Sequence, residues 1–233
     1  MVSERRMDLP ETLQLPIFPL GVVLFPGMPL PLHIFEERYR AMIRRCLEEK
    51  HGFGVVLLRE GLAERPGGTP YEVGTVARIV RHVRLADGRY NILVRGLRRF
   101  QILASHLDAA GYLTAQVALL DEDEHDRRHL AILHDELEAQ CDAFLQELVT
   151  LTGSRIDPIP FPADPTTASY HVAHYLPVYT WEKQRLLEAS STDVRLAEEL
   201  RILRRERGML REFGVAPAIF QIEDGQGPRV LQN

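Results

Sequence analysis

The 233-residue sequence has little cysteine, lysine or tryptophan, and it has no long apolar run. Its two cysteines, Cys46 and Cys141, fall on apolar helical stripes without metal-ligand spacing, so we expect two small buried hydrophobes and no disulfide. No stretch approaches the roughly 18 apolar residues of a membrane span, and the polar start, MVSERRMDLP, has no signal-peptide core. These absences predict a cytoplasmic protein with no membrane partner.

The two lysines, Lys50 and Lys183, are not in a setting that binds nucleotide or cleaves peptide bonds. A phosphate-binding P-loop requires Gly-Lys followed by Ser or Thr, and neither lysine follows a glycine. A serine–lysine dyad would have to use one of these lysines, yet no serine lies in a G-x-S-x-G turn. We therefore expect no catalytic residues, no cofactor and no enzymatic activity.

Two pairs of histidines have the spacing of metal ligands on a helix. His125 and His129 are at i and i+4, and His171 and His174 are at i and i+3, so each pair can share a helix face. Neither pair belongs to an H-E-x-x-H motif, and no third ligand is apparent. Solvated or hydrogen-bonded histidines are therefore favoured, and no metal is expected.

The first half of the chain has the apolar period of strands. Two proline-containing runs, Leu13–Phe18 and Pro29–Ile34, alternate in the way of strands with one buried face. Because Pro16 and Pro31 cannot donate a ladder hydrogen bond, we expect both runs at an edge or a bulge. From Glu36 the period becomes that of a helix lying on the sheet. Further strands are expected at Phe53–Leu58, Gly74–Leu85, Tyr90–Val94, Phe100–Leu103 and Gly111–Leu120.

The second half has a helical period. An acidic cluster, Asp121–Asp126, opens a helix whose apolar residues recur at three and four as far as Leu151. The proline-rich run Asp157–Pro162 predicts an extended connector. Arg207 interrupts the leucine seam of the last helix, and we expect it at a solvent-exposed end. The remaining helices are expected at Thr166–Leu176, at Trp181–Glu188, and from Ser190 or Ser191 to Gly214.

These patterns predict an α+β fold of two domains and a tail. We expect a β-rich domain at residues 1–120, a helical domain at 121–214 and an extended tail at 215–233. The tail carries three apolar residues that need a place to be buried, namely Ile219, Phe220 and Ile222. We expect the tail to dock on the chain itself or on a neighbouring copy, and the second arrangement would form a homo-oligomer.

One long segment also resembles a known family. Residues 15–43, LPIFPLGVVLFPGMPLPLHIFEERYRAMI, closely resemble the start of the N-terminal, substrate-binding domain of the Lon protease family, and GTVARIV and ILVRGLRRFQI follow in the family's order. The resemblance covers roughly residues 13–214. It implies a PUA-like pseudo-barrel of strands followed by a helical bundle. It also implies a stand-alone bacterial member without the ATPase and protease domains.

The same resemblance implies a function. We expect a non-catalytic module that binds exposed apolar segments of unfolded or degradation-prone proteins, with a separate ATP-dependent protease as a partner. The binding surface is expected in the cleft between the barrel and the bundle, although packing in the core is the favoured role for each single aromatic residue there. The candidate residues are Phe161, Tyr175, Tyr179 and Trp181.

An uneven charge distribution supplies the alternative. Residues 71–105 contain seven arginines against two acids, whereas residues 121–156 have a net charge of −7. Attraction between the two halves, or solvation, is the favoured interpretation. The alternative is a barrel that binds RNA or another nucleic acid through a basic stripe from Arg78 to Arg99, with Arg81 and Arg84 as its test residues. The net charge of −5 for the whole chain makes nucleic acid the less favoured partner.

Overall fold

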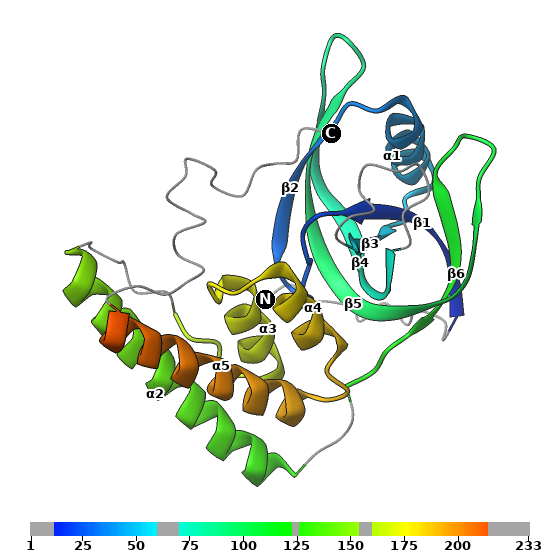
Figure 1. Ribbon diagram of the computed structural model, residues 1–233. Coiled ribbons are helices and arrows are strands. Elements are labelled where there is room, and N and C mark those ends of the chain that lie inside the picture. Colours follow the sequence, from blue (N-terminus) through cyan, green and yellow to red (C-terminus); the bar gives the residue numbers. More distant parts are fainter. Residues whose placement is uncertain (1–11, 60–69, 123–125, 154–159, 214–233) are drawn as a thin grey trace, which may run out of the picture.

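The computed structural model describes residues 12–59, 70–122, 126–153 and 160–213. Within these ranges a strand-built part and a helix-built part lie side by side (Figure 1). The expected tail at 215–233, His125 and part of the expected connector lie outside the described residues. No helix within the described ranges is long and apolar enough to cross a membrane.

The strand-built part is one mixed sheet that closes on itself. Its six strands have the order β2-β5-β4-β3-β1-β6, and β5 pairs a second time with β6. Among the strand pairs of the described residues, only β1 and β3 run parallel. The strands in the described residues are β1 (Thr12–Leu20), β2 (Pro29–Ile34), β3 (Phe53–Leu58), β4 (Pro70–Arg84), β5 (Tyr90–Leu107) and β6 (Leu113–Leu119).

The long strand β5 corrects the sequence interpretation. The expected strands Tyr90–Val94 and Phe100–Leu103 are parts of one strand, because the polar stretch between them does not break it. Instead, β5 exchanges one of its partners along its length. Residues 90–95 pair with β2, and residues 100–107 pair with β6, while β4 stays on the other side. This exchange of partners allows β5 to curve around the closed sheet.

The position of β1 is a second correction. The expectation of an edge or a bulge holds for Pro31, because β2 pairs with β5 alone. For Pro16 it holds only locally, because β1 as a whole lies between β3 and β6. Pro16 pairs with Thr114 of β6 and precedes the first β1–β3 pair, which joins Ile17 to Gly54. At Pro16, β1 is therefore paired with β6 only.

Helix α1 (Glu37–Glu49) covers one side of the sheet as expected (Figure 1). Its buried face includes Tyr39, whose ring lies 4.3 Å from that of Phe18 between centroids. A second apolar cluster surrounds Phe100, whose ring would collide with a side chain at either Gly54 or Gly74. A strand that buries one face in such a cluster and exposes the other has apolar residues at every second position, which is why the strand periods were legible in the sequence.

The helix-built part consists of α2 (Arg127–Thr152), α3 (Pro165–Tyr175), α4 (Thr180–Glu188) and α5 (Thr192–Phe213). The leucine seam of α5 is buried, as the period predicts. Arg207 is not at a solvent-exposed end, because its side chain is only 16% exposed. Its Nη2 lies 2.8 Å from Oε1 of Glu147 on α2, so the residue that interrupts the seam joins the two longest helices.

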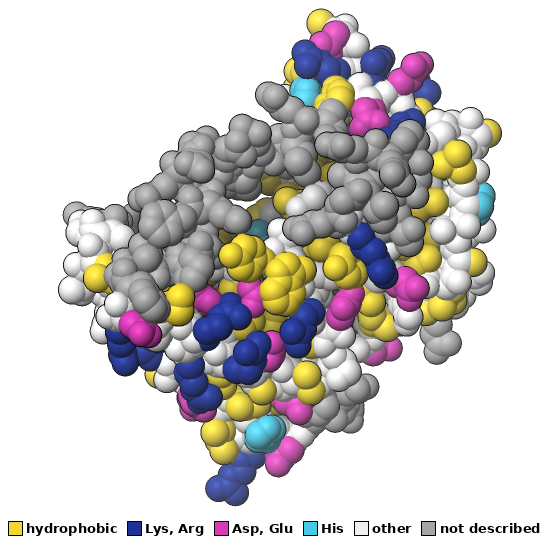
Figure 2. All heavy atoms as spheres, in the orientation of Figure 1, with side chains coloured by type: hydrophobic (Ala, Val, Ile, Leu, Met, Phe, Trp, Pro, Cys, Tyr) yellow, Lys and Arg dark blue, Asp and Glu magenta, His cyan; other side chains and the backbone are white. Residues whose placement is uncertain are grey.

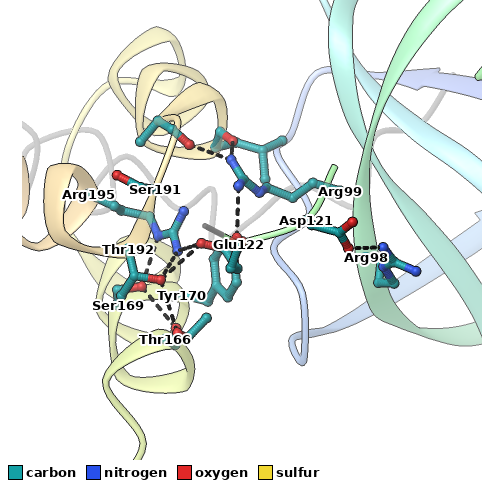
Figure 3. Close-up of polar contacts among 12 residues, drawn as sticks. Arg98, Arg99, Asp121, Glu122, Thr166, Ser169, Tyr170, Ser191, Thr192 and Arg195 are labelled. Atoms are coloured by element: carbon teal, nitrogen blue, oxygen red, sulfur yellow. Dashed lines mark hydrogen bonds and ion pairs between the residues drawn. The ribbon is translucent and has the colours of Figure 1, made fainter. Parts of the chain in front are cut away.

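One carboxylate connects the strand-built part to the helices (Figure 3). Glu122 follows β6, and its Oε1 lies 2.8 Å from Nη2 of Arg99 on β5. Its Oε2 accepts hydrogen bonds from Arg195 Nη2 and Thr192 Oγ1 of α5, each at 2.9 Å. The hydroxyl of Tyr170 on α3 also donates to Glu122. We call these five residues the Glu122 network.

Two further contacts support this junction. Arg99 donates to the backbone oxygens of Leu187, at 2.9 Å, and of Ala189. Gln184 of α4 donates its Nε2 to the backbone oxygen of Val73 on β4 at 3.0 Å. The expected attraction between the basic and the acidic halves is therefore realised by specific bonds. The division into two domains near residue 120 stays a prediction.

Candidate functional site

Three exposed aromatic side chains lie close together in the chain at the junction of α3 and α4. Tyr175 is 55% exposed, Tyr179 43% and Trp181 44%, so none of them packs in the core, which corrects the role favoured from the sequence. The rings of Tyr179 and Trp181 are nearly parallel, at an angle of 10° and a centroid distance of 6.4 Å. We call these three residues the aromatic patch. Figure 2 shows hydrophobic side chains, in yellow, gathered over α4 and the segment that leads into it.

The local sequence explains why these rings face outward. Helix α3 ends at Tyr175, since Pro177 cannot continue a helix. Leu176, which is 4% exposed, anchors the connection in the core. The backbone amide of Tyr179 then donates to Oε2 of Glu182 at 3.3 Å, which supports the start of α4. A short connection held at both ends therefore presents the rings between two fixed helices.

Three ionisable side chains lie next to the aromatic patch. Lys183 donates its Nζ to the backbone oxygen of His174 at 2.6 Å, and the ring of Tyr175 contacts His174 and His171 at centroid distances of 4.7 and 4.9 Å. Burial, with smaller contributions from Lys183 and His171, lowers the pKa of His174 to about 4. Burial also lowers the pKa of His171. Both imidazoles are therefore neutral at pH 7, and they add no charge next to Tyr175.

Sequence reasoning missed Lys183 as part of this site. Burial lowers its pKa to about 8, so its ammonium group still carries a charge at pH 7. The only available signal was its place two residues after Trp181 on a short helix. Within the described ranges, no three His, Cys, Asp or Glu side chains are placed to hold a metal ion. The chemistry that the patch offers is apolar and aromatic contact.

Phe161 is not part of the aromatic patch. It is half-buried, and its ring meets the edge of His134 on α2 at 5.2 Å between centroids. It borders an open depression of about 470 Å³ that also includes Pro165, the first residue of α3. Tyr175 is at the other end of this 11-residue helix, about 15 Å away along its axis. The structure therefore stacks Tyr179 against Trp181, leaves Tyr175 exposed at the end of α3 just before them in the chain, and places Phe161 elsewhere.

The basic stripe is not one surface. Arg99 is buried in the Glu122 network, and Arg98 forms an ion pair with Asp121. Arg81 faces Leu93 across the β4–β5 ladder, whereas Arg84 faces the buried Tyr90. Since successive side chains of a strand alternate between faces, Arg81 and Arg84 lie on opposite sides of the sheet. This arrangement gives no support to a nucleic-acid groove lined by both residues.

Comparison with known proteins places the chain in a family. Residues 14–205 match the family model described as the ATP-dependent protease La (LON) substrate-binding domain. The chain belongs to this family. It is 30% identical to a Lon protease of Anaeromyxobacter dehalogenans over 88% of its own length and 24% of that protein. It is 25% identical to a Lon protease of Escherichia coli K12 over 86% of its own length and 26% of that protein. The chain thus spans about a quarter of the length of these relatives.

Solved structures of this family have the same fold. The Lon N-terminal domain protein from Xanthomonas campestris superimposes with a TM-score of 0.61 at 26% identity, covering 81% of this chain and 98% of that one. The N-terminal domain of the Mycobacterium avium complex Lon protease gives 0.63 at 22% identity over 82% and 98%. The family resemblance and the combination of a mixed sheet with helices are therefore confirmed. The PUA-like label and the bundle arrangement stay predictions.

Proposed function

We propose that this Lon substrate-binding domain is a non-catalytic module that binds exposed apolar segments of unfolded or degradation-prone proteins at the aromatic patch. The family supports the general role of substrate binding. The observation that carries the finer proposal is the exposure of Tyr175, Tyr179 and Trp181 on neighbouring residues of one junction. Aromatic rings with a polar edge supply much of the energy at protein interfaces, because they bury a large area with few rotatable bonds.

The affinity of such a patch should be modest. An apolar contact of roughly 400 Å² contributes about 10 kcal/mol at ~25 cal/mol per Å². Association costs of roughly 4–15 kcal/mol cancel much or all of this gain. We therefore expect micromolar or weaker binding to a single segment. A weak site of this kind suits a module that samples many sequences.

Removing two of the exposed rings should abolish most of the binding without harming the fold. We expect the double variant Tyr179→Ser, Trp181→Ser to bind a labelled, leucine- and phenylalanine-rich peptide about tenfold more weakly, a loss of about 1.4 kcal/mol. Fluorescence anisotropy measures the affinity, and thermal unfolding should show a transition that stays cooperative with only a modest fall in Tm, because neither side chain belongs to the buried core.

Ile132→Ser is the matched control, since Ile132 is an apolar side chain of α2 that is 59% exposed outside the patch. It should leave peptide affinity unchanged. Equal losses in the control and in the double variant would show that general surface hydrophobicity, and not the patch, binds the peptide.

Other finer expectations rest on the sequence alone. They are the absence of enzymatic activity, a cytoplasmic location, a separate ATP-dependent protease as partner, and self-association through residues 215–233. The last of these concerns residues outside the described ranges. Sedimentation of a chain shortened after residue 214 tests it, because an unchanged mass would speak against a role of the tail in assembly.

A further inference from the structure

The outer face of the sheet formed by β2, β5 and β4 carries an exposed group of arginines. Directly paired residues share one face of a sheet. Arg95 of β5 pairs with Arg78 of β4 on one side and with Pro29 of β2 on the other. One step along the face, Leu93 pairs with Arg81 and with Pro31. All three arginines are exposed, and together with Pro29, Pro31, Leu93 and Val83 they form what we call the arginine face.

This arrangement leaves like charges next to one another. Arg78 and Arg95 are Cα partners, so their side chains leave the backbone about 5 Å apart. None of Arg78, Arg81 and Arg95 forms an ion pair or a side-chain hydrogen bond with another residue of the described ranges. By contrast, Arg89, which precedes β5, and Arg98 and Arg99 of β5 each pair with an acid. Like charges placed directly opposite each other weaken a ladder, so the fold gains nothing from this pairing.

We propose that the arginine face is a second docking surface, which binds an acidic segment of a partner polypeptide. Carboxylates at alternate positions of an extended chain are about 6.8 Å apart. That spacing equals the step along β5 from Arg95 to Leu93, and Leu93 faces Arg81. A segment with acids at every second position can therefore place one carboxylate at the Arg78–Arg95 pair and the next at Arg81.

The apolar residues of the arginine face favour a polypeptide over a nucleic acid. Val83 is 53% exposed, and Leu93 is half-buried between Pro31 and Arg81. These side chains suit the aliphatic stems of bound glutamates and apolar residues that flank the acidic run, whereas the face offers no Phe, Tyr or Trp for base stacking. Tyr90, the nearest aromatic residue on β5, points to the buried side.

The proline edge of β2 decides how a partner chain is held. Pro29 and Pro31 lack backbone N–H groups, so this edge cannot donate a full ladder to an added strand. An acidic segment therefore has to lie across the face and bind through side chains. Arginine suits this role, because its guanidinium binds a carboxylate through two parallel hydrogen bonds.

The test uses the full chain and a fluorescein-labelled peptide with Glu at alternate positions and Gly, Pro or Leu between them. We expect binding that weakens as salt is raised, and at least a tenfold loss in the double variant Arg78→Gln, Arg95→Gln. Arg84→Gln is the matched control, because Arg84 is exposed on the same strand, without an ion pair in the described ranges, but on the opposite face. It should retain the affinity within about twofold.

Thermal unfolding supplies a second readout. Because the Arg78–Arg95 pair is repulsive, either single glutamine variant should raise the Tm by about 1–3 °C at low salt, and the gain should vanish at high salt. A fall in Tm would show that these arginines are structural and would overturn the proposal. The same holds if the acidic peptide does not bind, or if Arg84→Gln weakens it as much as the double variant.

Tighter binding of a single-stranded oligonucleotide than of the acidic peptide, with the same dependence on Arg78 and Arg95, would also overturn the proposal. It would assign the face to nucleic acid. Because the arginine face shares no residue with the aromatic patch, a failure here leaves the aromatic-patch proposal untouched, and the reverse also holds.

Discussion

Replacing Glu122 with alanine should destabilise the protein by about 3 kcal/mol, because it removes the partner of two buried guanidinium groups. The side chains of Arg99 and Arg195 are 2% and 0% exposed, and each lies within 2.9 Å of the Glu122 carboxylate. A buried charge that loses its counter-ion keeps the full cost of its removal from water. The free energy of unfolding in urea measures the loss.

Asp121→Ala is the matched control for this prediction. The carboxylate of Asp121 is 83% exposed and pairs with the partly exposed Arg98, so the variant should cost only about 0.5 kcal/mol. If the variants of Glu122 and Asp121 had equal effects, the Glu122 network would not hold the strand-built and helix-built parts together.

The same network makes stability depend on pH in a known direction. Burial raises the pKa of Glu122, but Arg195, the hydroxyl of Tyr170 and Arg99 outweigh it and hold the pKa below its usual range. A carboxyl whose pKa is lowered on folding contributes stability above its unfolded pKa of about 4.5, and this contribution is lost as the pH falls through the folded pKa. The difference between the wild type and Glu122→Ala should therefore shrink in acid.

Replacing Glu199 with methionine should have the opposite effect to Glu122→Ala and stabilise the protein by about 2 kcal/mol at neutral pH. Glu199 of α5 is fully buried, and neither of its carboxyl oxygens has a hydrogen-bond partner in the described part of the chain. Burial raises its pKa well above the usual range, against a weaker opposing effect of Arg195. Methionine fills a similar volume without a buried polar group.

The pH dependence of this gain separates it from simple repacking. Because the pKa of Glu199 is raised on folding, the wild type is penalised increasingly as the pH rises above the usual glutamate value of 4.5. The gain from Glu199→Met should be largest at neutral pH and smallest in acid. The neighbouring Glu198→Met is the control, since it removes a partly exposed ion pair with Arg201 and should cost about 0.5 kcal/mol. A gain independent of pH would show that the buried carboxyl group of Glu199 is not its cause.

The sequence predicted those elements whose residues obey one local period. The strands from Leu13 to Leu120 and the leucine seam of α5 could be read because water is excluded from one face of each. The strands expected at Tyr90–Val94 and Phe100–Leu103 form one strand, since the partner exchange of β5 is a property of the closed sheet. No local pattern records that exchange.

The burial of single residues was harder to predict. Tyr175, Tyr179 and Trp181 were candidates for the binding surface, with core packing the favoured role of each. All three are exposed, because a period shows which residues share a face and not which face is covered. Arg195 and Glu199 were not expected to be buried, although both lie on the face of the leucine seam. Their burial follows from α5 packing against both α2 and α3, which widens its covered face.

Strand β4 carries one arrangement of arginines that the sequence could predict and one that it could not. Arg81 and Arg84 are three residues apart, and an odd spacing in a regular strand places them on opposite faces, so this separation was legible in the sequence. Arg78 and Arg81 have the same spacing but share a face, because the β4–β5 register shifts between Ile79 and Arg81. A bulge of this kind depends on the partner strand.

The most direct test of the central claim uses Trp181, the single tryptophan of the chain, as a reporter within the aromatic patch. A tryptophan-free peptide rich in leucine and phenylalanine should shift its emission to shorter wavelength and saturate in the micromolar range or above, since the bound segment removes water from the exposed indole. The same peptide with serine in place of its apolar residues should cause no shift. Binding detected by anisotropy with unchanged Trp181 emission would contradict the account.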